Sequence, residues 1–354
     1  MAPIQIGVQF HLHYWNLSIP ELIKLGQMAK TGGGIEQLWV TDNLECRNSF
    51  VVLAALAAKI PINLGTALTV QYFRSPVDAA DSIASISELM DGSELSIGLG
   101  RGNPSTPNLV HSPKPISMLR ETAQSLHGLL AGEAVSFRDY PTLASYFNFN
   151  PATSFHLRFD SKTPTRLYCG GNGPLAMAVG GEFMDGLLFG GEFKAVAATG
   201  RLPSLLQIFD DAAKNVGKEE VLPKLAQVKL SVSRNREVAR DFARVNAGRR
   251  ILGMRRLGFT SEDIMRLGVD PEEVDRLEMA NLKGASPQQF GRLVSDAMLD
   301  AIFIAGDPEH CRERMLEVRE TAHEHEFQQL KFSELGPDPK ESIRLLCEEI
   351  IPAL

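Results

Sequence analysis

The amino-acid sequence predicts an α/β protein folded as a (β/α)8 barrel of the TIM type, with insertions. Short runs rich in β-forming residues alternate with longer helical stretches along all 354 residues, which is typical of parallel βαβ units. Eight such strands are expected, the number that a closed barrel requires. No early GxGxxG follows the first strand, which counts against the alternative, an open doubly wound sheet.

The first half of the chain supplies four strand–helix units and then a less regular stretch. Pro20 lies in the first turn of the first helix, a position that proline favours. Gly132 follows the fourth helix, where glycine commonly ends a helix. We interpret residues 135–163 as an insertion on the barrel. The expected strands are residues 4–10, 37–41, 62–70 and 95–99, and the expected helices are residues 20–31, 50–59, 76–90 and 116–130.

The second half resumes the alternation and carries a second insertion. Residues 255–300 are largely helical and charged, and we interpret them as a second insertion on the barrel, with a small helical lid or a dimer surface as the alternative. Residues 301–305 are expected to be an apolar link, and a single domain would span residues 1–354. The expected strands are residues 166–169, 186–189, 225–232 and 328–333, and the helices are residues 174–183, 236–254, 308–323 and 340–351, with one or two more within 194–216.

Composition excludes several classes of function. Thirty-six Lys and Arg against 43 Asp and Glu give a net charge of −7, which argues against nucleic-acid and membrane-surface partners. The apolar run at residues 51–58 is far shorter than the roughly 20 residues of a membrane-spanning helix. No secretion leader is recognisable, so we expect a cytoplasmic protein with a small-molecule substrate. The four cysteines are far apart and indicate free thiols and no metal site.

A glycine-rich bend follows the fifth strand, at the end of a barrel where active sites lie. Gly170, Gly171, Asn172 and Gly173 lead into a helix opened by Pro174. Glycines let backbone N–H groups approach a phosphate, and a helix N-terminus favours an anion. The bend is therefore either a phosphate site or a tight strand-to-helix turn, and the spacing does not separate the two.

Other polar side chains also follow strands. Arg101, after the fourth strand, either binds a phosphate or forms a surface ion pair. His11 and His13 would share one side of an extended segment, as acid–base groups, as half of a metal site or, as we favour without a third ligand nearby, as two loop histidines. Asp42 either orients a polar group or caps the next helix. Cys169 is either a nucleophile or, as we favour, a buried thiol.

A series of motifs occurs in a fixed order along most of the chain. These are L-W-V-T-D at 38–42, L-G-T-A-L-T-V-Q-Y-F-R-S-P at 64–76, I-G-L-G-R-G at 97–102, K-P-I-S-M-L-R-E at 114–121, L-L-A-G-E at 129–133, G-N-G-P-L-A-M-A-V-G-G-E at 171–182, M-D-G at 184–186, G-D-P-E at 306–309 and L-G-P-D-P at 335–339. The ordered set resembles the luciferase-like flavin-dependent oxidoreductases. Within them it is most similar to the methylenetetrahydromethanopterin reductase branch, which uses the deazaflavin coenzyme F-420.

The resemblance implies a flavin or deazaflavin at the C-terminal ends of the strands. Its phosphate would lie on the bend after the fifth strand, with Arg101 assisting, and a bulge after the third strand would support the central ring. In this family the bulge often contains a cis peptide bond without proline, and Ala67–Leu68 is the matching position. The implied cofactor-binding residues are Asp42, Thr66, Ala67, Leu68, Arg101, Gly170, Gly171, Asn172, Gly173 and Pro174.

Two positions depart from the family pattern. Asn43 replaces a histidine that often follows the aspartate at the end of the second strand, and Gln9 replaces a glutamate of the reductase branch. Neither residue titrates, so both offer only neutral hydrogen bonds. His11 or His13 could supply the missing acid–base group. The predicted catalytic residues are therefore Gln9, His11 and Asn43.

The resemblance leaves three hypotheses for function. The first is a two-component monooxygenase, in which reduced FMN arrives from a separate flavin reductase and O2 oxidises a small organic substrate. The second is hydride transfer between coenzyme F-420 and a carbon–nitrogen or carbonyl substrate. The third is a non-catalytic homologue that keeps the barrel for binding. We expect the first, in a homodimer formed through the helices beside the second and third strands, as relatives commonly form.

Overall fold

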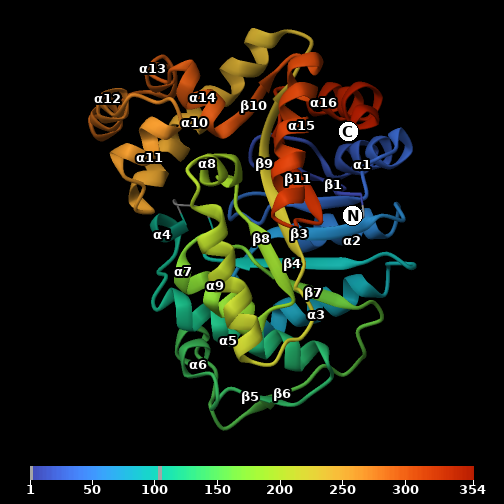
Figure 1. Ribbon diagram of the computed structural model, residues 1–354. Helices are drawn as coiled ribbons and strands as arrows, with labels where there is room; N and C mark the ends of the chain where they lie inside the picture. The colour runs from blue at the N-terminus through green and yellow to red at the C-terminus, as the bar shows by residue number, and fades with distance from the viewer. Residues whose placement is uncertain (1–2, 103–105) are drawn as a thin grey trace.

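The computed structural model describes residues 3–102 and 106–354 and has the expected barrel (Figure 1). Eight parallel strands close on themselves, because the last strand pairs with the first and the sixth with the seventh. The prediction of a (β/α)8 barrel of the TIM type is therefore confirmed. In barrel order, the strands are β1 (Gln5–Phe10), β2 (Gln37–Val40), β3 (Asn63–Val70), β4 (Leu95–Gly100), β7 (Thr165–Cys169), β8 (Gly186–Phe189), β9 (Lys224–Val232) and β11 (Gln329–Leu335).

Helices cover the outside of the barrel, as Figure 1 shows. Several begin at a side chain that accepts backbone N–H groups of the first turn, such as Asn48, Ser75 and Asp307. The segment at 194–216, for which one or two helices are predicted, contains two. The helices are α1 (Ile19–Gly32), α2 (Ser49–Ala57), α3 (Pro76–Ser87), α4 (Thr106–Leu109), α5 (Pro115–Leu130), α7 (Pro174–Phe183), α8 (Phe193–Ala198), α9 (Leu202–Asn215), α10 (Arg236–Arg256), α15 (Pro308–Glu324) and α16 (Pro339–Leu345).

Two segments differ from the sequence-based prediction. The sequence predicts a link at residues 301–305, but Phe303–Gly306 form the short strand β10, which pairs in parallel with the end of β9. Because β9 is nine residues long, it pairs with β8 at its start and β10 at its end. The last predicted helix ends early: α16 is followed by a π turn (Leu346–Ile350) and a 3-10 turn (Ile351–Ala353).

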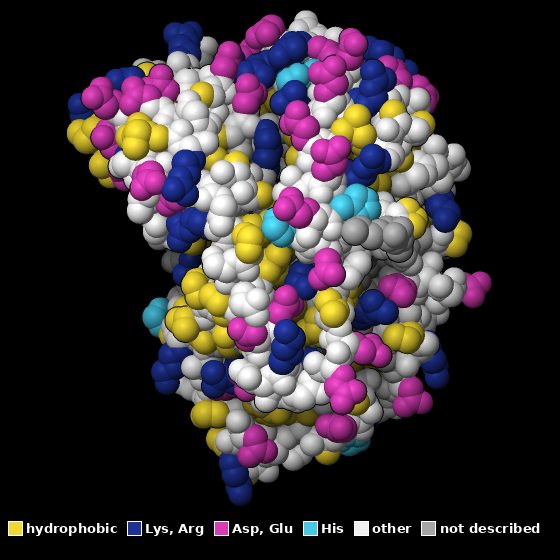
Figure 2. All heavy atoms as spheres, in the orientation of Figure 1, with side chains coloured by type: hydrophobic (Ala, Val, Ile, Leu, Met, Phe, Trp, Pro, Cys, Tyr) yellow, Lys and Arg dark blue, Asp and Glu magenta, His cyan; other side chains and the backbone are white. Residues whose placement is uncertain are grey.

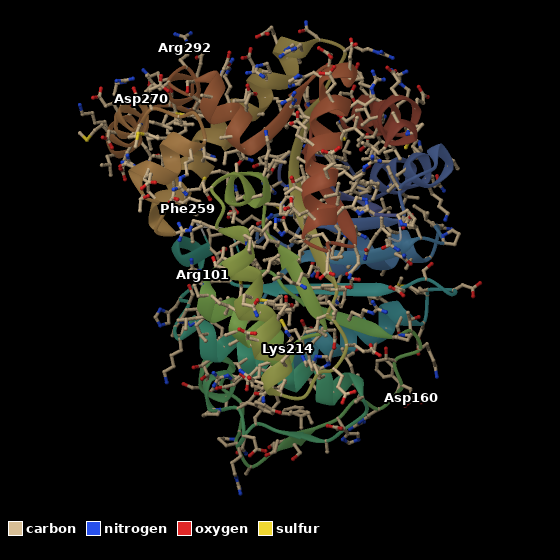
Figure 3. All side chains as sticks on the ribbon, in the orientation of Figure 1. Arg101, Asp160, Lys214, Phe259, Asp270 and Arg292 are labelled. Carbon is tan, nitrogen blue, oxygen red and sulfur yellow. The ribbon has the colours of Figure 1, made fainter. Side chains whose placement is uncertain are left out.

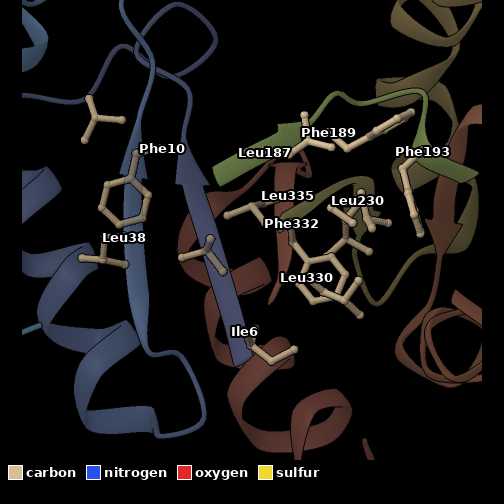
Figure 4. Close-up of a cluster of buried hydrophobic side chains, with 14 of the residues drawn as sticks. Ile6, Phe10, Leu38, Leu187, Phe189, Phe193, Leu230, Leu330, Phe332 and Leu335 are labelled. Atoms are coloured by element: carbon tan, nitrogen blue, oxygen red, sulfur yellow. The ribbon is translucent and has the colours of Figure 1, made fainter. Parts of the chain in front are cut away.

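Alternation along each strand separates two environments. Phe10 of β1 and Phe332 of β11 belong to the main apolar cluster between the sheet and the helices (Figure 4). Side chains at the alternate positions point into the barrel. Trp39 and Tyr168 form an inner apolar cluster there. A barrel interior is usually filled by branched apolar side chains, but here buried Gln9, Lys229 and Lys331 occupy it as well.

Both segments interpreted as insertions have secondary structure of their own. The first contains an antiparallel pair of two-residue strands and a helix, and it packs around an aromatic cluster that includes Phe137 and Phe149. The second forms a group of short helices at one side of the barrel in Figure 1, with charges of both signs on the face seen in Figure 2. These elements are β5 (Val135–Ser136), α6 (Pro141–Phe147) and β6 (Ser154–Phe155), and α11 (Ser261–Arg266), α12 (Pro271–Leu282), α13 (Pro287–Gly291) and α14 (Asp296–Ile302).

Within the described residues, every helix is too short or too polar to cross a membrane.

Candidate active site

The C-terminal end of β3 carries the bulge that the family resemblance implies. The register between β3 and β4 shifts between Thr66 and Thr69, and the Ala67–Leu68 peptide bond is cis, as predicted. The Leu68 side chain lies against two glycines. A Cβ at Gly100 or Gly170 would approach its methyl groups to 2.6 or 2.1 Å, so a larger residue at either position would force the Leu68 side chain to move.

Gln9 connects this bulge to the far side of the barrel interior. Its Nε2 donates to the carbonyl oxygen of Ala67 at 3.0 Å, and its Oε1 accepts a hydrogen bond from Lys331 Nζ. The Lys331 ammonium also donates to Gln227 Oε1 at 3.0 Å. Gln9 is buried, and both ends of its amide are hydrogen-bonded inside the barrel, so in this structure it positions the bulge rather than reaching out of the barrel.

The glycine-rich bend leaves the N-terminus of α7 open. Gly173 is the N-cap of α7, and among the described residues no side chain caps the helix and a Cβ built on Gly173 would meet nothing within 4 Å. The Asn172 side chain is held away, since its Oδ1 accepts from the Gly190 backbone N at 2.8 Å and its Nδ2 donates to Glu192 Oε2 at 3.0 Å. Exposed backbone N–H groups at a helix N-terminus suit a phosphate, so the bend fits the anionic arm of a flavin or deazaflavin.

Arg101 follows β4 and is exposed. Figure 3 shows it beside α4, at the side of the barrel from which the helices near Phe259 project. The bend, the bulge and Arg101 thus follow three consecutive strands of the barrel, β3, β4 and β7.

The two histidines after β1 do not lie on an extended segment as predicted. Residues 11–14 form a turn, in which the backbone N–H of Tyr14 donates to the carbonyl oxygen of His11 at 3.2 Å. The turn buries His11 and leaves His13 exposed, although their rings lie 5.2 Å apart. His11 also stacks on Tyr14, with 5.2 Å between the ring centroids and 28° between the planes. Both ring nitrogens of His11 lack a hydrogen-bond partner among the described residues.

Asp42 and Asn43 occupy different positions after β2. The Asp42 carboxylate accepts from Arg74 at 2.6 and 3.1 Å, from Ser49 Oγ at 3.0 Å and from the Val70 backbone N at 3.2 Å. These donors fill its acceptor sites and tie the ends of β2 and β3 together. Asn48, not Asp42, caps the following helix, so the capping alternative for Asp42 is wrong. The Asn43 Nδ2 lies 3.1 Å from His13 Nδ1.

Charged side chains that the sequence analysis did not select complete the mouth of the barrel. Lys229 of β9 forms a buried ion pair with Glu334 at the end of β11. Glu334 Oε1 also lies 3.8 Å from His11 Nε2. Glu192, which holds Asn172, pairs with Arg250 of α10 at 3.0 Å. Two signals in the sequence identify such residues: a lysine within a predicted strand, as at Lys229, and a polar residue directly after the eighth predicted strand, as at Glu334.

Buried charges in this region shift one another's pKa values. Burial lowers the pKa of Lys331 well below 10.5, and the charge of Lys229 lowers it further.

Burial raises the pKa of the Cys169 thiol to about 12, and its Sγ donates to the carbonyl oxygen of Ala176 at 3.2 Å. Cys169 is therefore the buried thiol that the sequence favours, because a protonated thiol is a poor nucleophile. Among the described residues, no group of His, Cys, Asp and Glu is arranged to hold a metal ion.

Comparison with known proteins supports the family resemblance. Residues 6–325 match the profile of the family described as luciferase-like monooxygenase. The chain is 27% identical to a 5,10-methylenetetrahydromethanopterin reductase from Archaeoglobus fulgidus, covering 99% of this chain and 100% of that protein. It is 26% identical to the enzyme of the same name from Methanolobus tindarius, covering 93% and 96%. The coenzyme F-420-dependent tetrahydromethanopterin reductase from Methanopyrus kandleri has the same fold, with a TM-score of 0.79 at 21% identity over 99% of both chains.

These relatives overturn one expectation from the sequence. We expected an FMN- and O2-using monooxygenase as the main function, but the relatives that match nearly the whole chain are named as reductases. Another relative, 25% identical over 90% of this chain, is named as an F-420-dependent glucose-6-phosphate dehydrogenase. The monooxygenase hypothesis is therefore wrong, and hydride transfer with F-420 is the better supported of the alternatives. The profile match covers most of the chain, and the protein belongs to the luciferase-like monooxygenase family.

Proposed function

We propose that this protein is an oxidoreductase that transfers a hydride between coenzyme F-420 and a small-molecule substrate with a carbon–nitrogen or carbonyl group. The observation that carries the proposal is the open bend before α7, where Gly173 leaves the helix N-terminus accessible. The reductase names of the full-length relatives support F-420 over FMN.

A deazaflavin bound in the mouth supplies one chemical property, the reversible exchange of a hydride with a substrate carbon. The residues of this chain supply the rest. The backbone of Gly171 and Gly173 and the first turn of α7 would hold the phosphate, and the bulge at Ala67–Leu68 would support the ring. Gln9 holds that bulge through the Ala67 carbonyl oxygen.

A proton must move to or from the substrate when the hydride does. When a carbonyl or an imine is reduced, the hydride binds carbon and the proton binds oxygen or nitrogen, and oxidation reverses both steps. Gln9 and Asn43 do not titrate, whereas His11 is buried beside Glu334 and its two ring nitrogens have no hydrogen-bond partner within residues 3–102 and 106–354. We therefore assign the proton transfer to His11 and leave neutral hydrogen bonding to Asn43.

The first test is cofactor binding. The protein is titrated with F-420, FMN and FMNH2, with fluorescence quenching of F-420 and absorbance of the flavins as the signals. We expect F-420 to bind at least tenfold more tightly than either flavin. Preferential binding of FMNH2 with O2 uptake would contradict the proposal, and failure of all three to bind would favour a non-catalytic homologue.

A variant of the bend tests the proposed phosphate site. Gly173→Ala places a methyl group in open space, and its φ of −86° suits alanine. The folding cost should stay below about 1 kcal/mol, the usual cost of alanine at an N-cap. F-420 binding should weaken at least tenfold, because the methyl group lies against the open helix N-terminus. Gly253→Ala in α10, where a Cβ also meets nothing within 4 Å, is the matched control and should bind F-420 normally. Equal affinity of the two variants would exclude the bend.

A variant of His11 tests its catalytic role. His11→Ala should reduce turnover by about 10²- to 10⁴-fold, the usual contribution of a general acid or base, while F-420 affinity stays within about threefold. Turnover equal to that of the unmodified protein would remove His11 from the mechanism and leave proton transfer to another group.

We also propose that the protein acts as a homodimer. The helix beside β2, α2, is apolar around most of its surface, and Val51 is 54% exposed on it. Light scattering after size exclusion measures the mass directly. Val51→Glu should then shift a dimer toward monomer, while a protein that is monomeric throughout would exclude this interface.

A further inference from the structure

The backbone at the end of β11 places Glu334 in an unusual conformation. Glu334 and Leu335 have φ angles of 76° and 63°, in the left-handed region. Each residue held there costs about 1–3 kcal/mol, and such residues cluster at functional sites. The next residue, Gly336, has a φ of 135°, and a Cβ on it would approach the carbonyl oxygen of Val232 to 2.7 Å. The chain is thus turned sharply where β11 ends, with a charged side chain buried at the turn.

The Glu334 carboxylate lies between a cation and an imidazole. Its Oε1 accepts a hydrogen bond from Lys229 Nζ and lies 3.8 Å from His11 Nε2. That second distance exceeds the 2.7–3.2 Å of a hydrogen bond by about 0.6 Å, so a small ring movement or a bridging water would connect the two groups. Glu334 therefore partners Lys229 directly and also interacts with the Tyr14 hydroxyl, and a carboxylate with about four acceptor sites keeps capacity on the side of His11.

His11 is a buried group that could use this acceptor capacity of Glu334. It is 5% exposed, and neither of its ring nitrogens has a hydrogen-bond partner in the described part of the chain. A buried polar group left unsatisfied costs about 1–3 kcal/mol. Tyr14 stacks on one side of the ring, and the Tyr14 hydroxyl accepts from Asn246 Nδ2 at 2.8 Å. The ring is confined, and one carboxylate is close enough to orient it.

We propose that Glu334, itself held by Lys229, is the positioning residue of His11. Its carboxylate accepts a hydrogen bond from Nε2–H of the imidazole and so leaves Nδ1 to exchange the proton with substrate. This inference rests on the proposed function, since it concerns the group that moves the proton. When substrate is oxidised, its O–H or N–H bond breaks and the proton binds Nδ1, while the hydride lost from carbon would be taken up by the deazaflavin that supplies the redox chemistry. The imidazolium formed is then paired with the Glu334 carboxylate. Reduction runs the same transfers in reverse.

The charges around the pair fit this assignment. The titratable groups that face His11 are Glu334, Lys229, His13 and Lys331. Burial lowers the pKa of His11 well below 6.5, Glu334 opposes this, and the three cationic or histidine neighbours add to it. His11 is therefore neutral near pH 7 and can accept a proton.

Glu334 stays ionised over the same range. The titratable groups that interact with it are His11, His13, Tyr14, Lys229, Arg250 and Lys331. Burial alone would raise the pKa of Glu334, but His11, Lys229 and Arg250 outweigh burial and lower it to about 2. A permanent carboxylate beside a neutral imidazole is the arrangement that fixes one tautomer of a catalytic histidine.

The test uses the protein without cofactor, so that it does not depend on the proposed function. Nitrogen-15 NMR of the eight histidines reports the tautomer and the pKa of each ring, and His11→Ala assigns the signal of His11. We expect His11 to carry its proton on Nε2. Glu334→Gln should lower the His11 pKa by at least half a unit and mix the two tautomers. Lys229→Met should raise that pKa, because it removes a nearby cation.

Glu341→Gln is the matched control. Glu341 lies just beyond β11 and hydrogen-bonds Ser233 Oγ at 3.0 Å, and it is not among the groups that face His11. Its replacement should leave the His11 signals unchanged. An unchanged tautomer and pKa of His11 in Glu334→Gln would overturn the inference, as would a protonated Nδ1 in the unmodified protein. Should Glu334→Gln not fold, the tautomer of His11 in the unmodified protein decides the question: a proton on Nε2 supports the inference and a proton on Nδ1 overturns it.

A kinetic measurement separates this inference from failure of the proposed function. If the protein binds and reduces F-420, Glu334→Gln should lower kcat at least tenfold with F-420 affinity unchanged, and Glu334→Asp should recover part of the loss. If the protein does not use F-420, the proposed function fails, while the NMR result for the Glu334–His11 pair still stands or falls separately.

Discussion

Asp42 and Glu334 are both buried carboxylates at C-terminal ends of barrel strands, but the protein surrounds them differently. Asp42 receives hydrogen bonds from Arg74, Ser49 and the Val70 backbone N. Glu334 has one cationic partner, Lys229, and faces His11 at 3.8 Å. A carboxylate with all its acceptor sites filled contributes to the structure alone, whereas one with unused capacity beside a titratable group is available for chemistry.

The largest expected effect on stability comes from removing the Asp42 carboxylate, whose acceptor sites are all filled. Asp42→Ala should lower the free energy of unfolding by about 3–5 kcal/mol, the usual cost of leaving one member of a buried pair uncompensated. Urea unfolding followed by circular dichroism measures it. Asp78→Ala is the matched control, since exposed Asp78 faces the same Arg74 at 3.9 Å. Surface pairs contribute up to about 1 kcal/mol, so equal losses in both variants would contradict a structural role specific to Asp42.

A smaller effect on stability is expected at Glu334. Glu334→Gln should cost about 1–3 kcal/mol at pH 7, the range for an unsatisfied buried group, because Lys229, whose pKa is lowered by burial, can lose its proton. The pKa of Glu334 is about 2 in the folded state and 4.5 ordinarily. Its contribution to stability is therefore present above pH 4.5 and is lost as the pH falls toward 2.

The measurement for Glu334 is the difference in unfolding free energy between the unmodified protein and Glu334→Gln at several pH values. That difference should be largest above pH 4.5 and should shrink on acidification. A difference that is constant between pH 7 and pH 3 would mean that Glu334 is not held ionised by its neighbours.

The smallest expected effect on the free energy of unfolding is that of replacing Lys331, the buried lysine of β11. Lys331→Met should change stability at pH 7 by about 1 kcal/mol or less, because removing a costly buried ammonium offsets the hydrogen bonds lost at Gln9 Oε1 and Gln227 Oε1. The pKa of Lys331 is lowered well below 10.5, so the unfolded chain binds an extra proton between the folded pKa and 10.5. Lys331 therefore makes stability rise with pH over that window. The rise should be smaller in Lys331→Met, and equal slopes for the two proteins would show that Lys331 does not titrate there.

Much of the architecture follows from local sequence. The alternation of strands and helices, Pro174 at the start of α7 and the apolar positions of β1 and β11 all depend on residues close in the chain. The same holds for the bulge, because the segment around Ala67 and Leu68 carries a recognisable motif. The strand β10 was missed because it is four residues long and forms only by pairing with the end of β9.

The candidate site shows where local sequence stops being informative. The sequence by itself determined that Gln9 and Asn43 cannot titrate and that glycines surround Asn172, since residue identity alone decides these points. Only the tertiary structure decided that His11 is buried against Glu334, 323 positions further along the chain, and that the Asp42 carboxylate is paired with Arg74. Closure of the barrel brings β11 next to β1, and the low polarity inside makes the pKa of each group depend on neighbours that the sequence places far apart.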